Sequence, residues 1–380
     1  MSGRRTLLAA VAVVLVAATG FAQGALGALR EIRPDDPAAR TGGSPVPFLA
    51  YYYIWYDRSS WDRAKRDLPS LGPYTSDDAA VARQHIRWAK AAGITGFIVS
   101  WKSTPALNRR LELLMQVAAE QHFTLAIIYQ GLDFNRRPQP VARATADLRY
   151  FDEHYAPNPV FQIFEKPLVI FSGTWAFSVV DLESMTARLR PNLLILASEK
   201  NVNGFKRVQR LVDGDAYYWS SVNPETYPDY QGKLDKMADA VHAAGGLWIA
   251  PAAPGYDATL LGGTMVVDRL DGDTLRREVR AAVLSGPDAV GLISWNEFSE
   301  NSFVEPSRQY AERYLQVLSE LNALPPPVVD LSGSTEDQPS ATGGWGTVVA
   351  RLAGLALVVA AIAIFPILRA RRRRGRSEPL

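Results

Sequence analysis

Short apolar runs recur along the middle of the chain, and a longer segment of mixed character separates each from the next. Eight runs have the length of a buried β-strand and are rich in β-branched and aromatic residues. They cover residues 48–53, 96–101, 124–130, 167–172, 193–199, 216–220, 247–252 and 289–295. The pattern therefore predicts eight strands.

Between most of these runs, apolar residues return every three or four positions, as on one face of an α-helix. The predicted helices cover residues 77–93, 105–120, 140–154, 179–189, 230–244, 274–284 and 307–322. Ser76 is the expected N-cap of the first helix, and Gly93 is its expected end. No clear helix follows the sixth run before residue 230, so the sixth unit has the weakest pattern.

Strands that alternate with helices imply a parallel sheet. Eight such units in about 280 residues match the size of a (β/α)8 TIM barrel, whose active site lies at the C-terminal ends of its strands. A doubly wound open sheet is the alternative. The sequence has no GxGxxG after the first strand and no GxxxxGK[ST], which are the phosphate-binding loops of nucleotide-binding folds. We therefore expect an α/β barrel over residues 45–323.

Both ends of the chain have features of membrane targeting. Two arginines precede an apolar stretch within residues 1–28, which predicts a secretory signal peptide or, alternatively, an uncleaved N-terminal anchor. Residues 347–368 are apolar apart from Arg351 and predict a transmembrane helix. The arginine-rich tail, 369–380, should then face the cytoplasm. Residues 324–346 are rich in Pro, Gly, Ser and Thr and predict a flexible linker, so the barrel is expected outside the cell membrane.

Composition restricts the chemistry of the predicted barrel. The 380 residues include 41 Lys and Arg against 39 Asp and Glu, and the basic tail accounts for the small excess, so no nucleic-acid partner is expected. The absence of cysteine excludes disulfides and thiolate nucleophiles. Four widely spaced histidines do not favour a metal site. We expect no cofactor, and the sequence indicates no protein partner.

Aromatic and polar residues gather where the predicted strands end. Sugar rings have an apolar face and a rim of hydroxyl groups, so this combination favours a site for an oligosaccharide or polysaccharide glycan. The alternative is that the aromatic residues fill the barrel core. The candidate substrate-binding residues are Tyr52, Tyr53, Trp55, Trp101, Tyr129, Trp219, Tyr256, Asp257 and Asn296. Other residues at or beyond strand ends are Lys102, Gln130, Asp133, Trp175 and Glu199.

The last strand continues into GLISWNEFSENSFVEPS, residues 291–307, which places Glu297 and Glu300 three positions apart. Glycoside hydrolysis uses a pair of carboxylic acids, so these two are the candidate catalytic residues. Residues three apart point to opposite faces of a regular strand, so Glu300 must lie on a loop for both to reach one substrate. In the alternative interpretation, Glu297 is an ion-paired structural residue and Glu300 is a solvated loop charge.

Four segments of the chain resemble glycoside hydrolase family 99, the endo-α-mannosidases and endo-α-mannanases, and more loosely the family 71 α-1,3-glucanases. They are YYYIWYD (51–57), LGPYTSDDAAVARQHIRWAKAAGITGFIVSWKS (71–103), APAAPGYD (250–257) and ISWNEFSENSFVEPSRQYAERYL (293–315). The resemblance covers most of the predicted domain. It implies a (β/α)8 barrel that cleaves an α-linked polysaccharide, such as α-mannan, internally and with retention of configuration.

The family motif NEWHEG, followed by IEP, corresponds here to residues 296–301 and 304–306. By this resemblance, Glu297 removes a proton from the sugar's own 2-hydroxyl, which attacks the anomeric carbon to give a 1,2-anhydro sugar. Glu300 acts as the acid and then the base, and should therefore have a raised pKa.

The chain departs from the family pattern at four positions. Phe298, Ser299 and Asn301 stand where the family motif has Trp, His and Gly, and Ile54 stands where the opening motif has Pro. Two alternatives to a family 99 glycosidase follow. One is a non-catalytic glycan-binding or cell-envelope assembly protein on the same barrel, and the other is a barrel hydrolase that uses a metal.

Overall fold

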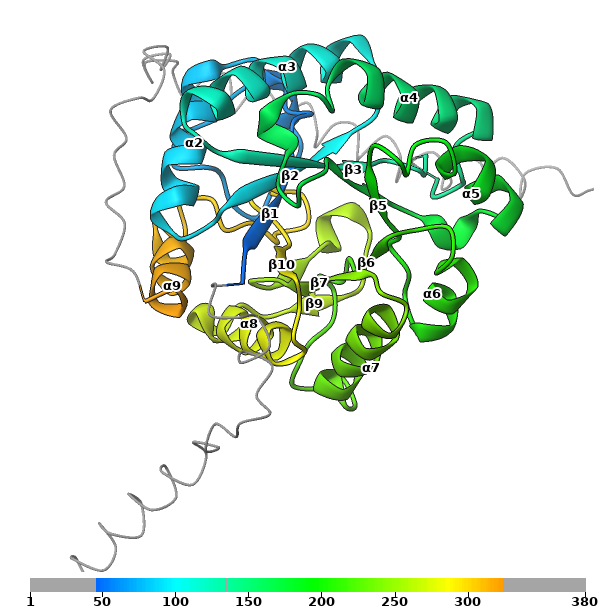
Figure 1. Cartoon of the computed structure of the whole chain (residues 1–380). Helices are drawn as coiled ribbons and strands as arrows, with labels where there is room; N and C mark the ends of the chain where they lie inside the picture. Colours follow the sequence, from blue (N-terminus) through cyan, green and yellow to red (C-terminus); the bar gives the residue numbers. More distant parts are fainter. Residues whose placement is uncertain (1–45, 134, 324–380) are drawn as a thin grey trace, which may run out of the picture. The chain divides into compact units, whose positions relative to one another are not determined.

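The computed structural model describes residues 46–133 and 135–323, which form a barrel of eight parallel strands (Figure 1). The barrel strands are β1 (Phe48–Tyr53), β2 (Gly96–Trp101), β3 (Thr124–Tyr129), β4 (Leu168–Phe171), β5 (Leu194–Leu196), β6 (Gly214–Ala216), β7 (Leu247–Ala252) and β10 (Ala289–Leu292). They pair in the order β5-β4-β3-β2-β1-β10-β7-β6, and a parallel bridge between Ala197 and Asp215 joins the two end strands. The predicted (β/α)8 barrel is confirmed, and the open sheet is wrong.

Helices surround the strands as an outer ring, as Figure 1 shows. They are α2 (Ala79–Ala91), α3 (Pro105–Glu120), α4 (Val141–His154), α5 (Val179–Thr186), α6 (Val202–Val208), α7 (Tyr230–Ala243), α8 (Asp273–Leu284) and α9 (Arg313–Leu321). A small antiparallel pair, β8 (Tyr256–Asp257) and β9 (Val266–Val267), lies in the connection between β7 and α8. The N-cap of α2 is Asp78 rather than Ser76, because the Asp78 side chain accepts the Ala80 and Val81 N–H groups.

The element boundaries differ from the sequence expectation in the fifth, sixth and last units. Helix α6 was not predicted, because its seven residues are too few to give a helical repeat. Strand β6 begins two residues before the predicted run and ends at Ala216, so Tyr217 and Tyr218 belong to the loop at the mouth of the barrel. Helix α9 begins at Arg313, six residues later than predicted.

Alternation along each strand divides the apolar residues between two packed layers. In β1, Leu49 and Tyr51 belong to the cluster inside the barrel, together with Ile98 of β2. Phe48 and Tyr52 belong to the larger cluster that lies between the strands and the helices. Every residue of β1 is buried for this reason. A side chain at a strand end can therefore face either the barrel mouth or the helices.

The predicted signal segment (1–28), linker (324–346), membrane helix (347–368) and basic tail (369–380) lie outside the described residues. Within residues 46–133 and 135–323, none of the helices has the length and apolar character needed to cross a bilayer.

Candidate active site

A cavity of about 390 Å³ opens at the C-terminal ends of the barrel strands. Its walls come from the ends of β1 to β6 and from the loop after β10. Six residues represent the six strand ends: Tyr53, Ser100, Gln130, Ser172, Glu199 and Tyr218. Glu300, from the loop after β10, lies in the same wall. This is the end of the barrel at which TIM-barrel enzymes carry out their chemistry.

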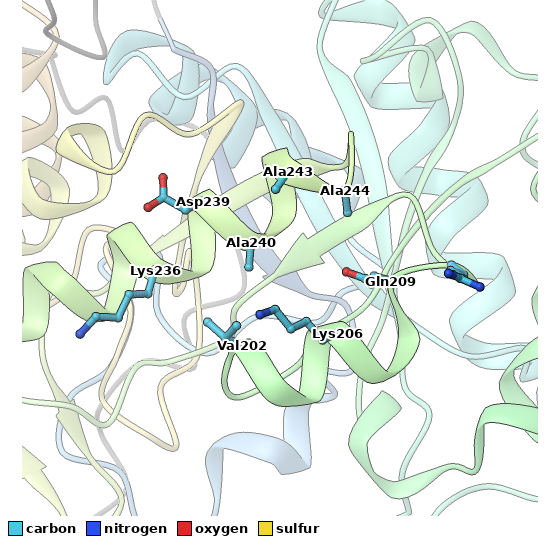
Figure 2. A pocket seen from close by; sticks show the side chains of 9 residues that line it. Val202, Lys206, Gln209, Lys236, Asp239, Ala240, Ala243 and Ala244 are labelled. Atoms are coloured by element: carbon cyan, nitrogen blue, oxygen red, sulfur yellow. The ribbon is translucent and has the colours of Figure 1, made fainter.

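Two larger hollows lie elsewhere and lack this convergence of strand ends. One, of about 690 Å³, is a groove between α6 and α7. Figure 2 shows the side chains that line it, including Lys206, Lys236 and Asp239. The other, of about 760 Å³, includes Gly214 and Leu247, which begin β6 and β7 at the opposite end of the barrel. Because catalytic loops follow the C-terminal strand ends, we take the smaller cavity as the candidate site.

Asn296 fixes the start of the loop that carries both candidate acids. Its Oδ1 accepts the Tyr53 N–H at 2.8 Å, and its Nδ2 donates to the Tyr53 carbonyl at 3.0 Å. The Tyr56 hydroxyl donates to the Asn296 carbonyl at 2.5 Å. Asn296 is fully buried, so its side chain positions the loop against the end of β1 rather than lining the cavity.

Glu297 follows directly and is held in one orientation. Its N–H donates to Ser294 Oγ at 2.8 Å, and its Oε1 accepts the Ser299 N–H at 2.9 Å. Only 5% of the residue is exposed. Burial and, to a lesser degree, the neighbouring Glu300 carboxylate raise the pKa of Glu297 to about 8. Glu297 therefore retains a proton at a pH at which an exposed glutamate is ionised.

Glu300 lies on the loop beyond the strand, as the sequence argument required, and it is half-buried in the cavity wall. Its carbonyl accepts the Asp257 N–H at 2.8 Å, which ties the loop to β8. Burial raises the pKa of Glu300, and the positive charge of Arg136 opposes this shift. The two glutamates thus form an interacting pair in which one proton is held above the usual range.

The sequence matches a family model across most of the barrel. Residues 57–320 match the model described as glycosyl hydrolase family 99. The chain belongs to glycosyl hydrolase family 99. Curated relatives include the glycoprotein endo-alpha-1,2-mannosidases of Rattus norvegicus, 20% identical over 260 residues, and Xenopus laevis, 21% identical over 261 residues. These matches cover 62% of this chain and 56% and 57% of the relatives, so the chain spans about half the length of each.

Solved structures agree with the fold of this family 99 protein. The GH99 endo-alpha-mannosidase from Bacteroides thetaiotaomicron, in complex with bis-tris propane, superposes with a TM-score of 0.65 at 19% identity. The match covers 73% of this chain and 97% of that chain. A second structure of the same enzyme gives a TM-score of 0.63 at 18% identity. At these identities the likeness establishes the shared barrel.

Two predicted substrate-binding residues of this family 99 protein line the cavity. Tyr53 and the 36% exposed Trp55 both line it, with ring centroids 4.3 Å apart. The Tyr53 and Tyr218 hydroxyl oxygens are 2.5 Å apart, and Tyr218 was missed because the sequence placed it inside a strand. Tyr256 does not line the cavity; burial and then Glu300 raise its pKa to about 12.

Three other predicted substrate-binding residues have side chains that point toward the helices. The Tyr52 hydroxyl lies 3.0 Å from His85 Nδ1 of α2. Trp101 Nε1 donates to an asparagine of α3 at 3.1 Å, and the Tyr129 hydroxyl donates to an aspartate of α4 at 3.2 Å. All three side chains are buried between strands and helices, so we leave them out of the proposed substrate site.

Trp219 and Asp257 have structural contacts near the mouth. The Trp219 ring stacks on Tyr230 with centroids 5.6 Å apart and does not line the cavity. Asp257 forms an ion pair with Arg66 at 2.9 Å. Strand-end position alone could not separate these residues from cavity residues, because it does not say which way a side chain points.

Two departures from the family motif fit the conformation of the loop that carries Glu297 and Glu300. Phe298 is fully buried and stacks on Phe303 with centroids 4.0 Å apart, so it packs in the core rather than in the cavity. Asn301 has φ 49°, a left-handed conformation that glycine adopts freely and that asparagine tolerates better than most residues. The phenylalanine and asparagine therefore meet the packing and backbone requirements of the loop.

Glu305, the third acid of the sequence, lies behind the site. The Tyr74 hydroxyl donates to its Oε2 at 2.9 Å, and His85 Nε2 lies 3.2 Å from its Oε1. Both partners are buried, and Tyr74 also accepts a hydrogen bond from Asn296. Glu305 thus supports the hydrogen bonds that hold Asn296 at the end of β1. Within the described part of the chain, no cluster of three or more His, Cys, Asp or Glu residues is placed to hold a metal ion.

Proposed function

We propose that this family 99 protein is an endo-acting glycoside hydrolase that cleaves an α-linked, mannose-containing glycan with retention of configuration. The observation that carries the proposal is the interacting pair Glu297 and Glu300 at the mouth of the barrel, on a loop that lies within the residues that match the family model. The family relatives named as endo-alpha-1,2-mannosidases support an α-mannoside as the substrate.

In the proposed first step, the Glu297 carboxylate takes the proton of the sugar 2-hydroxyl. The freed O2 attacks the anomeric carbon, and the bond from that carbon to the leaving oxygen breaks. Glu300 protonates the leaving oxygen. In the second step, Glu300 removes a proton from water as the water oxygen attacks the anomeric carbon. The bond from that carbon to O2 breaks, and O2 recovers its proton from Glu297.

The raised pKa values indicate that the pair holds one proton near neutral pH, and in the free protein they favour its location on Glu297. The reactive form has that proton on Glu300, with Glu297 ionised. Because burial raises the pKa of Glu297, its carboxylate is a stronger base toward a sugar hydroxyl than an exposed glutamate would be. Tyr53 and Tyr218 line the same cavity and share one hydroxyl proton in their mutual hydrogen bond, which leaves the other hydroxyl proton to donate to a sugar oxygen. The exposed Trp55 ring offers a stacking surface.

We also propose that the barrel acts outside the cytoplasm, in a single-pass membrane protein. The apolar segments 1–28 and 347–368 and the arginines after the second segment support this orientation.

The test is to incubate the full chain with α-mannan oligosaccharides and to follow the products by mass spectrometry and NMR. Products with retained configuration should form, and Glu297→Gln and Glu300→Gln should each abolish them. Glu183→Gln, at an exposed position on α5, is the matched control and should cleave normally. Glycan binding without cleavage in the unaltered chain would instead indicate the non-catalytic glycan-binding protein.

A further inference from the structure

The cavity has a basic side. Lys102, Arg136 and Lys200 come from the loops after β2, β3 and β5, and all three line the cavity that contains Glu300. Trp175, after β4, lies among them. Lys200 Nζ is 4.0 Å from the centroid of the Trp175 ring, and the Arg136 guanidinium carbon is 5.8 Å from it. One indole ring therefore holds two cations at the same part of the wall.

Two acids on this side of the cavity, Asp133 and Glu199, form ion pairs with other arginines. Asp133 accepts two backbone N–H groups and forms an ion pair with Arg137 at 2.9 Å. Glu199, which is 2% exposed, forms an ion pair with Arg207 at 3.0 Å. In residues 46–133 and 135–323, neither Arg136 nor Lys200 forms an ion pair with a carboxylate. Arg136 and Lys200 therefore carry positive charge that no ion pair in these residues neutralises, and Glu300 is the acid on which the charge of Arg136 acts.

A neutral glycan gains little from such a site. Lys200 covers one face of Trp175 at 4.0 Å, which leaves less of this ring to stack on a sugar. Two neighbouring cations in a concave wall attract an anion, and hydrogen bonds from Lys or Arg to a phosphate or carboxylate are stronger than those to a hydroxyl.

We propose that the glycan substrate carries an anionic group, a phosphate ester or a carboxylate, which Arg136 and Lys200 bind while the scissile bond lies at Glu297 and Glu300. This assignment rests on the proposed function, and it specifies the class of α-mannoside that the cavity accepts. Arg136 and Lys200 are specificity-determining residues in this assignment.

One other role for Arg136 must be separated from this one. Its charge also acts on Glu300, whose pKa it lowers. Loss of that effect would change the reaction of every substrate alike. Loss of an anion contact would weaken only the anionic substrate, so a comparison of matched neutral and charged ligands separates the two roles.

The experiment uses the full chain with three matched ligands: a neutral α-mannotetraose, the same tetraose with a 6-phosphate on one mannose, and the same tetraose with that carbon oxidised to a carboxylate. Dissociation constants are measured by calorimetry in the Glu297→Gln chain, and kcat/KM in the unaltered chain. We expect at least one anionic ligand to bind roughly tenfold more tightly than the neutral one. This preference should shrink as sodium chloride rises from about 20 to about 200 mM. The anionic ligand that binds more tightly shows whether the preferred group is a phosphate ester or a carboxylate.

Variants test the two cations directly. Arg136→Gln and Lys200→Gln should each reduce the preference several-fold and leave binding of the neutral ligand within about twofold. Lys206→Gln, which removes an exposed lysine from the α6–α7 groove of Figure 2, is the matched control and should not change it.

The outcomes separate the two proposals. Equal binding of all three ligands, or an equal loss for neutral and anionic ligands in both variants, would overturn the anionic assignment while cleavage of the neutral tetraose sustains the glycosidase. If the anionic ligands bind more tightly in a salt-sensitive way but no ligand is cleaved, the glycosidase proposal is overturned and the anionic assignment is sustained. Failure of all three ligands to bind would overturn both proposals.

Discussion

Replacing Glu297 with glutamine should stabilise the protein, and the gain should grow with pH. The native carboxyl keeps its proton up to a pKa of about 8, whereas the unfolded chain releases that proton near the usual value of 4.5. Between pH 4.5 and pH 8 the unfolded state binds fewer protons than the folded state. The free energy of unfolding of the unaltered chain is therefore not reduced by Glu297 below about pH 4.5, and it falls as the pH rises toward 8. Glutamine has the shape of the protonated acid and does not titrate.

The magnitude follows from the pKa difference. A shift from 4.5 to about 8 corresponds to about 5 kcal/mol as an upper limit, accumulated at about 1.4 kcal/mol per pH unit. At pH 7.5 the variant should gain at most roughly 4 kcal/mol over the unaltered chain, and near pH 4.5 almost nothing. Glutamine Oε1 can still accept the Ser299 N–H, so the loop should keep its conformation.

The assay is thermal unfolding of both full chains between pH 4.5 and 7.5. At the upper pH the variant should melt several degrees higher, at about 2 to 4 °C for each kcal/mol. The difference between the two chains matters, because other groups titrate in both. Glu183→Gln serves as a control whose Tm difference should not vary with pH. A constant Tm difference for Glu297→Gln across this range would refute the buried, protonated state of the pair.

Three further results are expected. The kcat/KM of the unaltered chain should decline above pH 8, because the reactive glutamate pair then loses its remaining proton; a rate that still increases to pH 9 would contradict this. Arg269→Met removes hydrogen bonds of 2.8 and 2.9 Å to the carbonyls of Asn301 and Phe303, so kcat should fall at least about tenfold. Arg276→Met, at a half-exposed ion pair of α8, should leave kcat unchanged. Asn301→Gly should be neutral or stabilising in thermal unfolding, whereas Asn301→Val should cost about 1 to 3 kcal/mol because of the positive φ.

The barrel was predictable because its main signals are local. Each long strand is a run of buried apolar residues bounded by turn residues, and each long helix has an apolar face, so the order of elements follows from the period of the pattern. The exceptions are short. Helix α6 has seven residues, which is too few for a clear helical repeat. Strands β5 and β6 have three residues each, so their positions depend on pairing with β4 and β7 rather than on their own sequence.

The candidate site was predictable only in part. Glu297 and Glu300 follow from the strand-to-loop transition and from the resemblance to the family motif. The structure places Glu300 in the cavity wall, whereas Glu297 is buried, close enough for the Glu300 carboxylate to raise its pKa. Tyr52 and Tyr129 look equivalent to Tyr53 in the sequence, since all three stand at strand ends. The direction of a side chain there depends on the register of the whole barrel, which no local pattern contains. Arg136 and Lys200 gave no signal, because single exposed cations in loops are common.

The segments that resemble the family meet around the loop that carries Glu297 and Glu300. Tyr53 and Tyr56, from the first segment, hydrogen-bond to Asn296, and Tyr74, from the second, bonds to both Asn296 and Glu305. Asp257, from the third, holds the carbonyl of Glu300. The loop is thus fixed mainly through backbone groups and buried hydroxyls, and position 298 contributes an apolar ring that packs in the core. Arg136, Trp175 and Lys200, on the basic side of the cavity, lie outside these segments, on the loops after β3, β4 and β5. A change of substrate within this family can therefore arise on that side of the cavity while the acid pair and its supports stay the same.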